Sequence, residues 1–81
     1  MVFGPISVML LRKEMLARYA ILRILLIEEK LERLGRRDLL ERLNRIPRTT
    51  FQKTEKVVQI LDSYANSIND IEKIIEELEK L

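Results

Sequence analysis

The chain has 81 residues, with fifteen Lys and Arg against thirteen Asp and Glu, so its formal net charge is +2. Its content of 47% hydrophobic and 35% charged residues is too apolar for a disordered tail and too charged for a membrane-spanning bundle. Cys and His are both absent, which excludes disulfides, thiolate metal sites, cysteine nucleophiles and the commonest general base. We therefore expect one soluble folded domain with no catalytic residue, metal site or cofactor.

Residue usage predicts an all-α fold. Leu, Ile, Arg, Glu and Lys dominate, and only two Gly and two Pro interrupt them. The Lys and Glu bias and the absence of Cys are typical of thermophiles. The longest strongly apolar stretch, Tyr19 to Ile27, contains Arg23 and is far shorter than the roughly 20 residues of a membrane span. With no secretory signal in the first residues, we expect a cytoplasmic protein without a membrane partner.

A long first helix is predicted to run from about Ile6 or Ser7 to Leu34. Pro5 suits the first turn of a helix, and Gly35 fits the position just past a helix end. Apolar residues recur at spacings of three and four, but they cover more than half of the helix circumference. Such a helix must be covered on several sides.

A short second helix is predicted to begin at Arg36-Arg37-Asp38 and to turn Leu39, Leu40 and Leu43 inward. Pro47 ends regular structure, because the residue before a proline disfavours the helical region, and Ile46 is predicted to be the buried plug of the turn. No Gly or Pro follows Thr49, so one helix is predicted from about Pro47 to Glu79, with a break between Ser63 and Asn69 as the alternative.

The end of the chain carries apolar residues at alternating spacings of three and four, which is a heptad seam. We expect it to hold two copies together, with intramolecular packing as the alternative. A second register through Ile60 and Leu81 makes the stripe too wide for a simple two-stranded coil, and the first helix is the obvious cover. The predicted dimerisation residues are Leu61, Tyr64, Ile68, Ile71, Ile74, Ile75 and Leu78.

Charge is distributed unevenly along the chain. Residues 33 to 56 hold eight basic and three acidic side chains, a local charge of +5. Residues 1 to 56 together hold thirteen basic and seven acidic side chains, a charge of +6, whereas residues 57 to 81 hold two basic and six acidic side chains, a charge of −4. This asymmetry predicts a basic head and an acidic, assembling tail.

The basic head fits double-stranded DNA. A helix that reads DNA must be exposed, supported by a second helix, and equipped with side chains that reach phosphates and base edges. Two of the predicted contacts, Arg48 and Gln52, can bind base edges, whereas Thr49, Lys53 and Lys56 suit phosphates. The flanking arginines can follow the DNA backbone, with affinity that falls steeply with salt. They are Arg36, Arg37, Arg42 and Arg45.

These residues resemble a known family. The stretch AILRILLIEEKLERLGRRDLLERLNRIPRTTFQKTEKVVQIL is similar to the three-helix core of winged helix-turn-helix regulators, the class that includes MarR-like and PadR-like proteins. LLERL at 39–43 corresponds to the second helix, and IPRTTFQK at 46–53 to the turn and the start of the recognition helix. The chain departs from the pattern because the turn is one residue longer, Glu55 replaces an apolar residue, and no β segment supplies a wing.

The resemblance implies a single helix-turn-helix domain over residues 1–81, with a DNA-binding core at about 20–60 and a C-terminal dimerisation helix at 61–81. We expect long N-terminal and C-terminal helices to interlock two copies into a homodimer. Its recognition helices, starting near Pro47, would enter successive major grooves about 34 Å apart on a palindromic site. Transcriptional repression is the simplest output, and no small-molecule substrate is evident.

Two other interpretations stay open. The basic side chains can be a solvated surface neutralised by nearby acids. Alternatively, the chain is a helical interaction or assembly module whose apolar stripes bind another protein. The acids Glu72, Glu76, Glu77 and Glu79 are interpreted as solubilising charge and not as a metal cluster.

Overall fold

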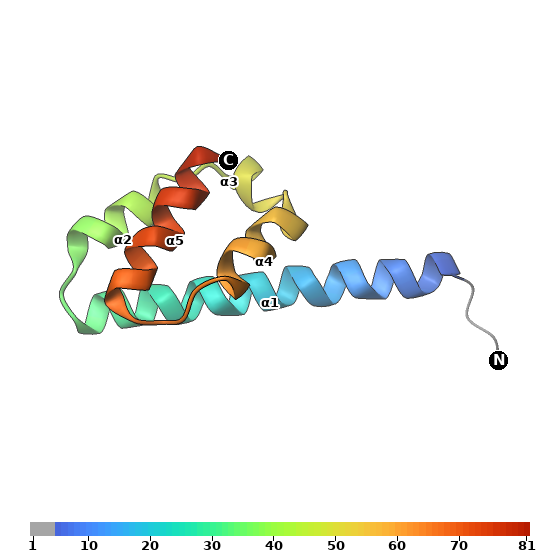
Figure 1. The fold of residues 1–81 in the computed structure, drawn as a ribbon, viewed down its shortest axis with the longest axis horizontal. Helices are drawn as coiled ribbons and strands as arrows, with labels where there is room; N and C mark the ends of the chain where they lie inside the picture. The colour runs from blue at the N-terminus through green and yellow to red at the C-terminus, as the bar shows by residue number, and fades with distance from the viewer. Residues whose placement is uncertain (1–4) are drawn as a thin grey trace.

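The computed structural model describes the backbone from Pro5 to Leu81 and the side chains from Arg12 onward. This part of the chain forms five helices, and no strand occurs in it. The all-α fold class is therefore confirmed. The helices are α1 (Pro5–Arg33), α2 (Arg37–Asn44), α3 (Arg48–Phe51), α4 (Thr54–Asp62) and α5 (Ile68–Lys80) (Figure 1).

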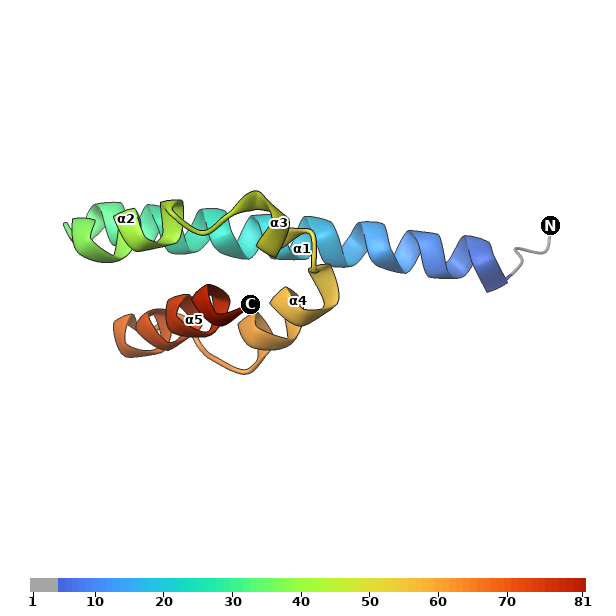
Figure 2. The ribbon, with the colours of Figure 1, turned by 90° about the horizontal axis from the view of Figure 1, so that it is seen from above.

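The long helix α1 is the spine of the molecule. Helices α2 to α5 gather on one side of its C-terminal half, and the N-terminal half extends beyond them (Figures 1 and 2). The principal extents are 50 × 22 × 19 Å, and α1 lies along the longest. Ala20, Ile27 and Leu31 of α1 face the other helices and are buried. In the described part of the chain, no helix is both long and apolar enough to cross a membrane.

The end of α1 is set by Gly35. Its φ of +69° lies in the left-handed region, which only glycine adopts without strain. The Gly35 N–H donates to the carbonyl of Glu32 at 3.2 Å, and the Arg36 N–H donates to the carbonyl of Leu31 at 2.9 Å. These two bonds form a Schellman motif, which satisfies the last carbonyls of the helix. The predicted helix end at Leu34 and Gly35 is confirmed.

Helix α2 and the turn after it follow the predicted pattern. Leu39 and Leu43 are 2% exposed and Leu40 is half-buried, so α2 turns its apolar side inward. Ile46 is 7% exposed, which confirms it as the buried plug of the turn. Pro47 adopts extended backbone at φ −62° and ψ 147°, and α3 begins directly after it.

The single helix predicted from Pro47 to Glu79 is wrong. Helix α3 ends after one turn at Phe51, and Lys53 leaves helical geometry at φ −80° and ψ 61° before α4 begins. The local sequence offers a physical reason, since Thr49, Thr50 and Thr54 are β-branched residues whose side chains are restricted in helices. Packing supplies another, because Thr50 of α3 and Val57 of α4 are both buried.

The second interruption lies at residues 63 to 67, where the alternative break was expected. The Ser63 hydroxyl donates to the carbonyl of Gln59 at 2.7 Å at the end of α4. Ser67 caps α5 by accepting a hydrogen bond from the Asp70 N–H at 3.3 Å, and Asp70 Oδ2 accepts one from the Ala65 N–H at 3.2 Å. This Ser-x-x-Asp cap lets the chain reverse, so α5 packs against α2 and α4.

The apolar stripe of the C-terminal region forms the core of the chain. Residues 61, 71, 74, 75 and 78 are 0% exposed, while Tyr64 and Ile68 are half-buried. Helix α1, the expected cover, packs against α4, whereas α5 packs against α2 and α4. The predicted dimerisation residues are therefore occupied within one chain. They are Leu61, Tyr64, Ile68, Ile71, Ile74, Ile75 and Leu78.

Candidate nucleic-acid interface

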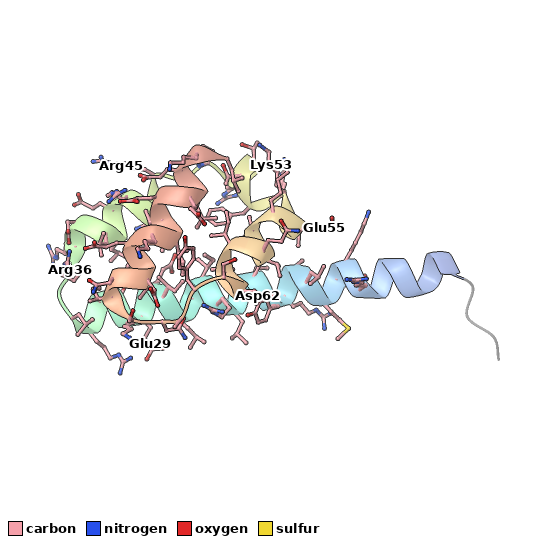
Figure 3. The ribbon with its side chains drawn as sticks, in the orientation of Figure 1. Glu29, Arg36, Arg45, Lys53, Glu55 and Asp62 are labelled. Carbon is pink, nitrogen blue, oxygen red and sulfur yellow. The ribbon has the colours of Figure 1, made fainter. Side chains whose placement is uncertain are left out.

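The predicted DNA contacts lie on the segment that joins α2 to α4. Arg45 ends α2 in helical geometry, Ile46 anchors the turn in the core, and the Thr50 N–H donates to the carbonyl of Pro47 at 3.0 Å. These local bonds hold residues 45 to 56 on the surface. Arg45 and Lys53 lie on the edge of the molecule far from α1 (Figure 3). We call residues 45 to 56 the basic edge.

The predicted DNA contacts on the basic edge are exposed. They are Arg45, Arg48, Thr49, Gln52, Lys53 and Lys56. Glu55 is the one acidic residue in this segment, so the basic edge carries four positive charges and one negative charge. Arg45, Arg48 and Lys56 make no side-chain hydrogen bond or ion pair with the side chains described from residue 12 onward. Lys53 Nζ donates to the backbone carbonyl of Leu81 at 2.8 Å. The charges on this edge face solvent.

Arg36 has a different environment from the basic edge. Its Nη2 lies 3.0 Å from Asp38 Oδ2 and 3.2 Å from Glu72 Oε1, so it links the start of α2 to α5. The hydrogen bond from Arg36 holds the pKa of Asp38 below its ordinary value. Arg36 is therefore engaged with acids of its own chain.

Arg42 is paired in the same way at the other end of α2. Its Nη2 donates to Glu79 Oε1 at 2.5 Å, and its Nε donates to Glu79 Oε2 at 3.3 Å, which is a two-point contact with the carboxylate. The pKa of Glu79 is lowered by this hydrogen bond. The predicted DNA contacts thus fall into two groups. Arg36 and Arg42 pair with acids of their own chain, whereas Arg37, like the cations of the basic edge, is exposed and has no ion pair with the described side chains.

The basic edge does not project from one helix. Arg48 and Thr49 lie on α3, Gln52 and Lys53 lie in the link, and Lys56 lies on α4. A recognition helix of regular length was expected here. Since α3 is a single turn, any contact with DNA must come from the α3–α4 pair and the end of α2 together.

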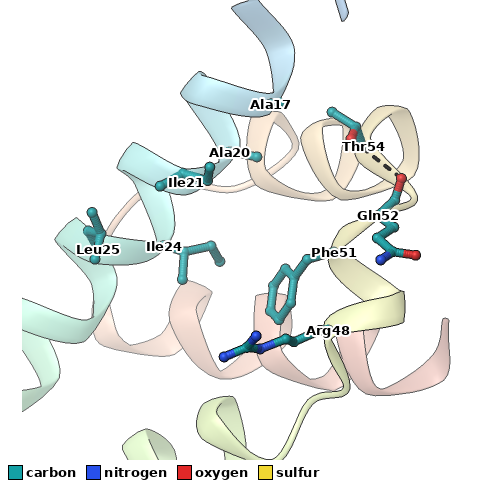
Figure 4. A pocket seen from close by; sticks show the side chains of 9 residues that line it. All are labelled: Ala17, Ala20, Ile21, Ile24, Leu25, Arg48, Phe51, Gln52 and Thr54. Carbon is teal, nitrogen blue, oxygen red and sulfur yellow. Dashed lines mark hydrogen bonds between the residues drawn. The ribbon is translucent and has the colours of Figure 1, made fainter. Parts of the chain in front are cut away.

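An apolar groove borders the basic edge, and sequence reasoning missed it. The groove has a volume of about 340 Å³ and lies between α1 and α3, with Ala17, Ile21 and Ile24 on one wall and Phe51 on the other. Arg48 lies beside Phe51 at its rim, and Thr54 Oγ1 donates to the carbonyl of Gln52 at 3.5 Å beyond it (Figure 4). The spacing of Ala17, Ile21 and Ile24 was the available signal, because it places them on one face of a helix.

No metal site accompanies the basic edge. Within the described residues there is no group of three or more acidic side chains placed to hold an ion. The acids of α5 that could imitate such a cluster instead include Glu72 and Glu79, which pair with Arg36 and Arg42.

Comparison of the chain with family models, with curated proteins and with solved structures returns no match. The evidence for its function is therefore the chemistry of its own residues.

Proposed function

We propose that the chain binds double-stranded DNA through the basic edge and acts as a transcriptional regulator, with repression as the simplest output. The observation that carries this proposal is the set of exposed cations Arg45, Arg48 and Lys56, which have no ion pair with the described side chains. Each of these cations can bind a phosphate without first breaking an ion pair with an acidic side chain.

The chemistry of the basic edge suits a duplex. Arg45 and Lys56 provide charge for phosphates, and Thr49 can donate a hydrogen bond to a phosphate oxygen. Gln52 and Arg48 can each make two-point contacts with base edges in the major groove. Neutralising phosphates releases counterions from DNA, so binding should weaken linearly on a logarithmic salt scale.

Helix-turn-helix recognition and a homodimer belong to this proposal. The resemblance to winged helix-turn-helix regulators supports it through α2, the Ile46 plug and the start of α3. In this proposal the reading element is the α3–α4 pair with its link, because a four-residue helix supplies one turn of contact.

A second candidate function is favoured by a separate observation. Helix α1 exposes large apolar side chains, with Met15 at 70%, Leu22 at 58% and Leu25 at 55% exposure. Contiguous exposed apolar surface commonly marks a protein interaction site. A helical interaction module without DNA binding would use this face and leave the basic edge as a solvated surface.

Binding to a labelled mixed-sequence duplex across a salt series tests the proposal. We expect the Arg45→Ala/Lys56→Ala variant to bind more weakly and to lower the slope of log K against log salt by about 2, which is about one unit for each lost phosphate contact. The matched control is Arg33→Ala/Lys73→Ala, which removes the same charge from exposed positions on α1 and α5.

Two outcomes would contradict the proposal. One is a folded chain that does not bind the duplex at low salt. The other is an equal loss of binding in the test and control variants, since that result would assign the effect to net charge instead of to the basic edge.

A further inference from the structure

The face of α1 that points away from the other helices has an apolar centre flanked by charged side chains. An α-helix turns by about 100° per residue, so the midpoint of Leu22 and Leu25 lies about 180° around the helix from the midpoint of the buried Ala20 and Ile27. Helices α2 to α5 lie on the buried side (Figure 1). The opposite side of α1 is therefore open over its length from Met15 to Glu32.

This open face carries a regular pattern. Its residues follow spacings of 3, 4, 3, 4 and 3, which is a heptad seam with leucines at the centre, a positive charge toward the N-terminus and negative charges toward the C-terminus. Ile21 and Leu26 flank the centre and are 61% and 47% exposed. We call this set the α1 seam: Met15, Arg18, Leu22, Leu25, Glu29 and Glu32.

We propose that a second copy of the chain packs antiparallel against the α1 seam. The residues that meet have numbers that sum to 47, which places Leu22 against Leu25 of the second copy. Arg18 then meets Glu29 of the second copy, and two-fold symmetry repeats each pair. Farther from the centre, Met15 lies beside the aliphatic stem of Glu32 of the second copy. The seam residues alternate between two heptad positions. In this register each pair joins one position of the first copy to the other position of the second copy, as in an antiparallel coiled coil.

Charge order selects a second antiparallel copy over the other occupants. A parallel copy would place Arg18 against Arg18 and Glu29 against Glu29, and like charges at such positions are destabilising. The seam carries its positive charge in one half and its negative charges in the other, so its own reversed copy places Arg18 against Glu29 on both sides of the leucine centre. The α1 seam thus contains both the apolar centre and the ion pairs of a specific partner.

This inference does not depend on DNA binding. It also moves the dimer contact from the C-terminal region to α1. The buried side chains of α5 remain in the core of each copy, and only exposed side chains of α1 enter the contact. Failure of DNA binding would therefore leave the dimer intact, and loss of the dimer would leave the basic edge in place.

Charge reversal tests the contact. The molar mass of the wild-type chain is measured by sedimentation equilibrium over a concentration range, beside Arg18→Glu, Glu29→Arg and the double variant. Each single change places two like pairs in the antiparallel contact, so we expect the dimer dissociation constant to rise at least tenfold. The double variant Arg18→Glu/Glu29→Arg restores opposite charges, and we expect a dissociation constant within about threefold of the wild type.

Lys13→Glu is the matched control. Lys13 lies on the same helix about 150° around from the centre of the α1 seam and is exposed. The same charge reversal there should leave the dimer unchanged. A wild-type chain that stays monomeric up to millimolar concentration, or a dimer equally weakened by Lys13→Glu, would overturn the proposal. So would a dimer that is insensitive to Arg18→Glu.

A distance measurement tests the direction of packing. The chain lacks cysteine, so Arg12→Cys introduces one site for a spin label. In the antiparallel register Arg12 of one copy lies level with residue 35 of the other, and a rise of 1.5 Å per residue with helix axes 8–10 Å apart gives a separation of about 35 Å. A parallel dimer would give a distance below about 20 Å. The distance expected for a parallel dimer, or a dimer whose contact lies on another surface, would contradict the inference.

Discussion

The hydroxyl of Tyr19 donates a hydrogen bond of 2.6 Å to the carboxylate of Asp62, a residue 43 positions later in the chain. The bond joins the middle of α1 to the end of α4. Arg23 extends it, because its Nη1 donates to the Tyr19 hydroxyl at 2.9 Å and its Nη2 donates to Asn66 Oδ1 at 2.9 Å. One arginine thus fixes the connection between α4 and α5 against α1. Arg23 also lies over the Tyr19 ring, 5.9 Å from its centroid.

We expect Arg23→Met to lower the free energy of unfolding by about 1–3 kcal/mol, since the substitution keeps an apolar stem and removes hydrogen bonds from a charged donor. Tyr19→Phe should cost about 1 kcal/mol through its lost hydroxyl. Urea unfolding followed by circular dichroism measures both. Lys13→Met on the same helix is the control, with an expected change within about 0.5 kcal/mol. An Arg23→Met chain as stable as the control would show that the hydrogen bonds of Arg23 add nothing to the free energy of unfolding.

Substitutions at Ile74 test whether this residue is a core residue of one chain or a contact between two copies. Its side chain is 0% exposed within one chain, so we expect Ile74→Ala to lower the free energy of unfolding by about 2–5 kcal/mol. Ile74→Glu should unfold the chain, because it buries an unpaired charge. Far-UV circular dichroism and molar mass measured together check this result. Lys73→Glu, at an exposed neighbouring position, is the control. A folded monomer from Ile74→Glu would instead place this residue in a contact between copies.

The pairing of Glu79 with Arg42 should make the stability of the chain depend on pH. Its pKa is lowered from the ordinary value of 4.5, chiefly by the hydrogen bond from Arg42. A carboxyl whose pKa falls on folding stabilises the native state above its unfolded pKa, and that stabilisation is lost as the pH falls through the folded pKa. We therefore expect Glu79→Gln to be less stable than the wild type at neutral pH.

The difference between Glu79→Gln and the wild type should shrink as the pH falls through the folded pKa of Glu79, because the protonated carboxyl is neutral like the amide of Gln. Urea unfolding at about pH 7 and about pH 2 measures it. The control is Glu41→Gln, an exposed change on α2 at a residue with no ion pair among the described side chains. A Glu79→Gln chain whose deficit is equal at both pH values would rule out the Arg42 pair as the cause.

Local rules predicted the first half of the fold. Pro5 and Gly35 mark the ends of the first helix by their backbone preferences, and Ile46 and Pro47 mark the turn after α2. These features depend on one residue and its neighbours, so the sequence is sufficient to place them.

The second half depended on contacts that are distant in sequence. The cap formed by Ser67 and Asp70 was present as a Ser-x-x-Asp pattern, but the apolar periodicity from Leu61 onward favoured one long helix. Once the chain reverses there, Glu79 lies beside Arg42, which is 37 positions earlier. The sequence could not predict that pairing, because it requires the position of α5 across α2.

The one-sided arrangement of helices on α1 has a consequence for how two copies would meet DNA. Arg45 and Lys53 of the basic edge lie on the side of the molecule away from α1, and Glu29 of the α1 seam lies on the other side of that helix. A two-fold axis that pairs the seams therefore turns the two basic edges outward in opposite directions. Such a dimer would not straddle neighbouring grooves of one straight duplex. It would bridge two duplexes, or two distant segments of one molecule, and could close a loop between them.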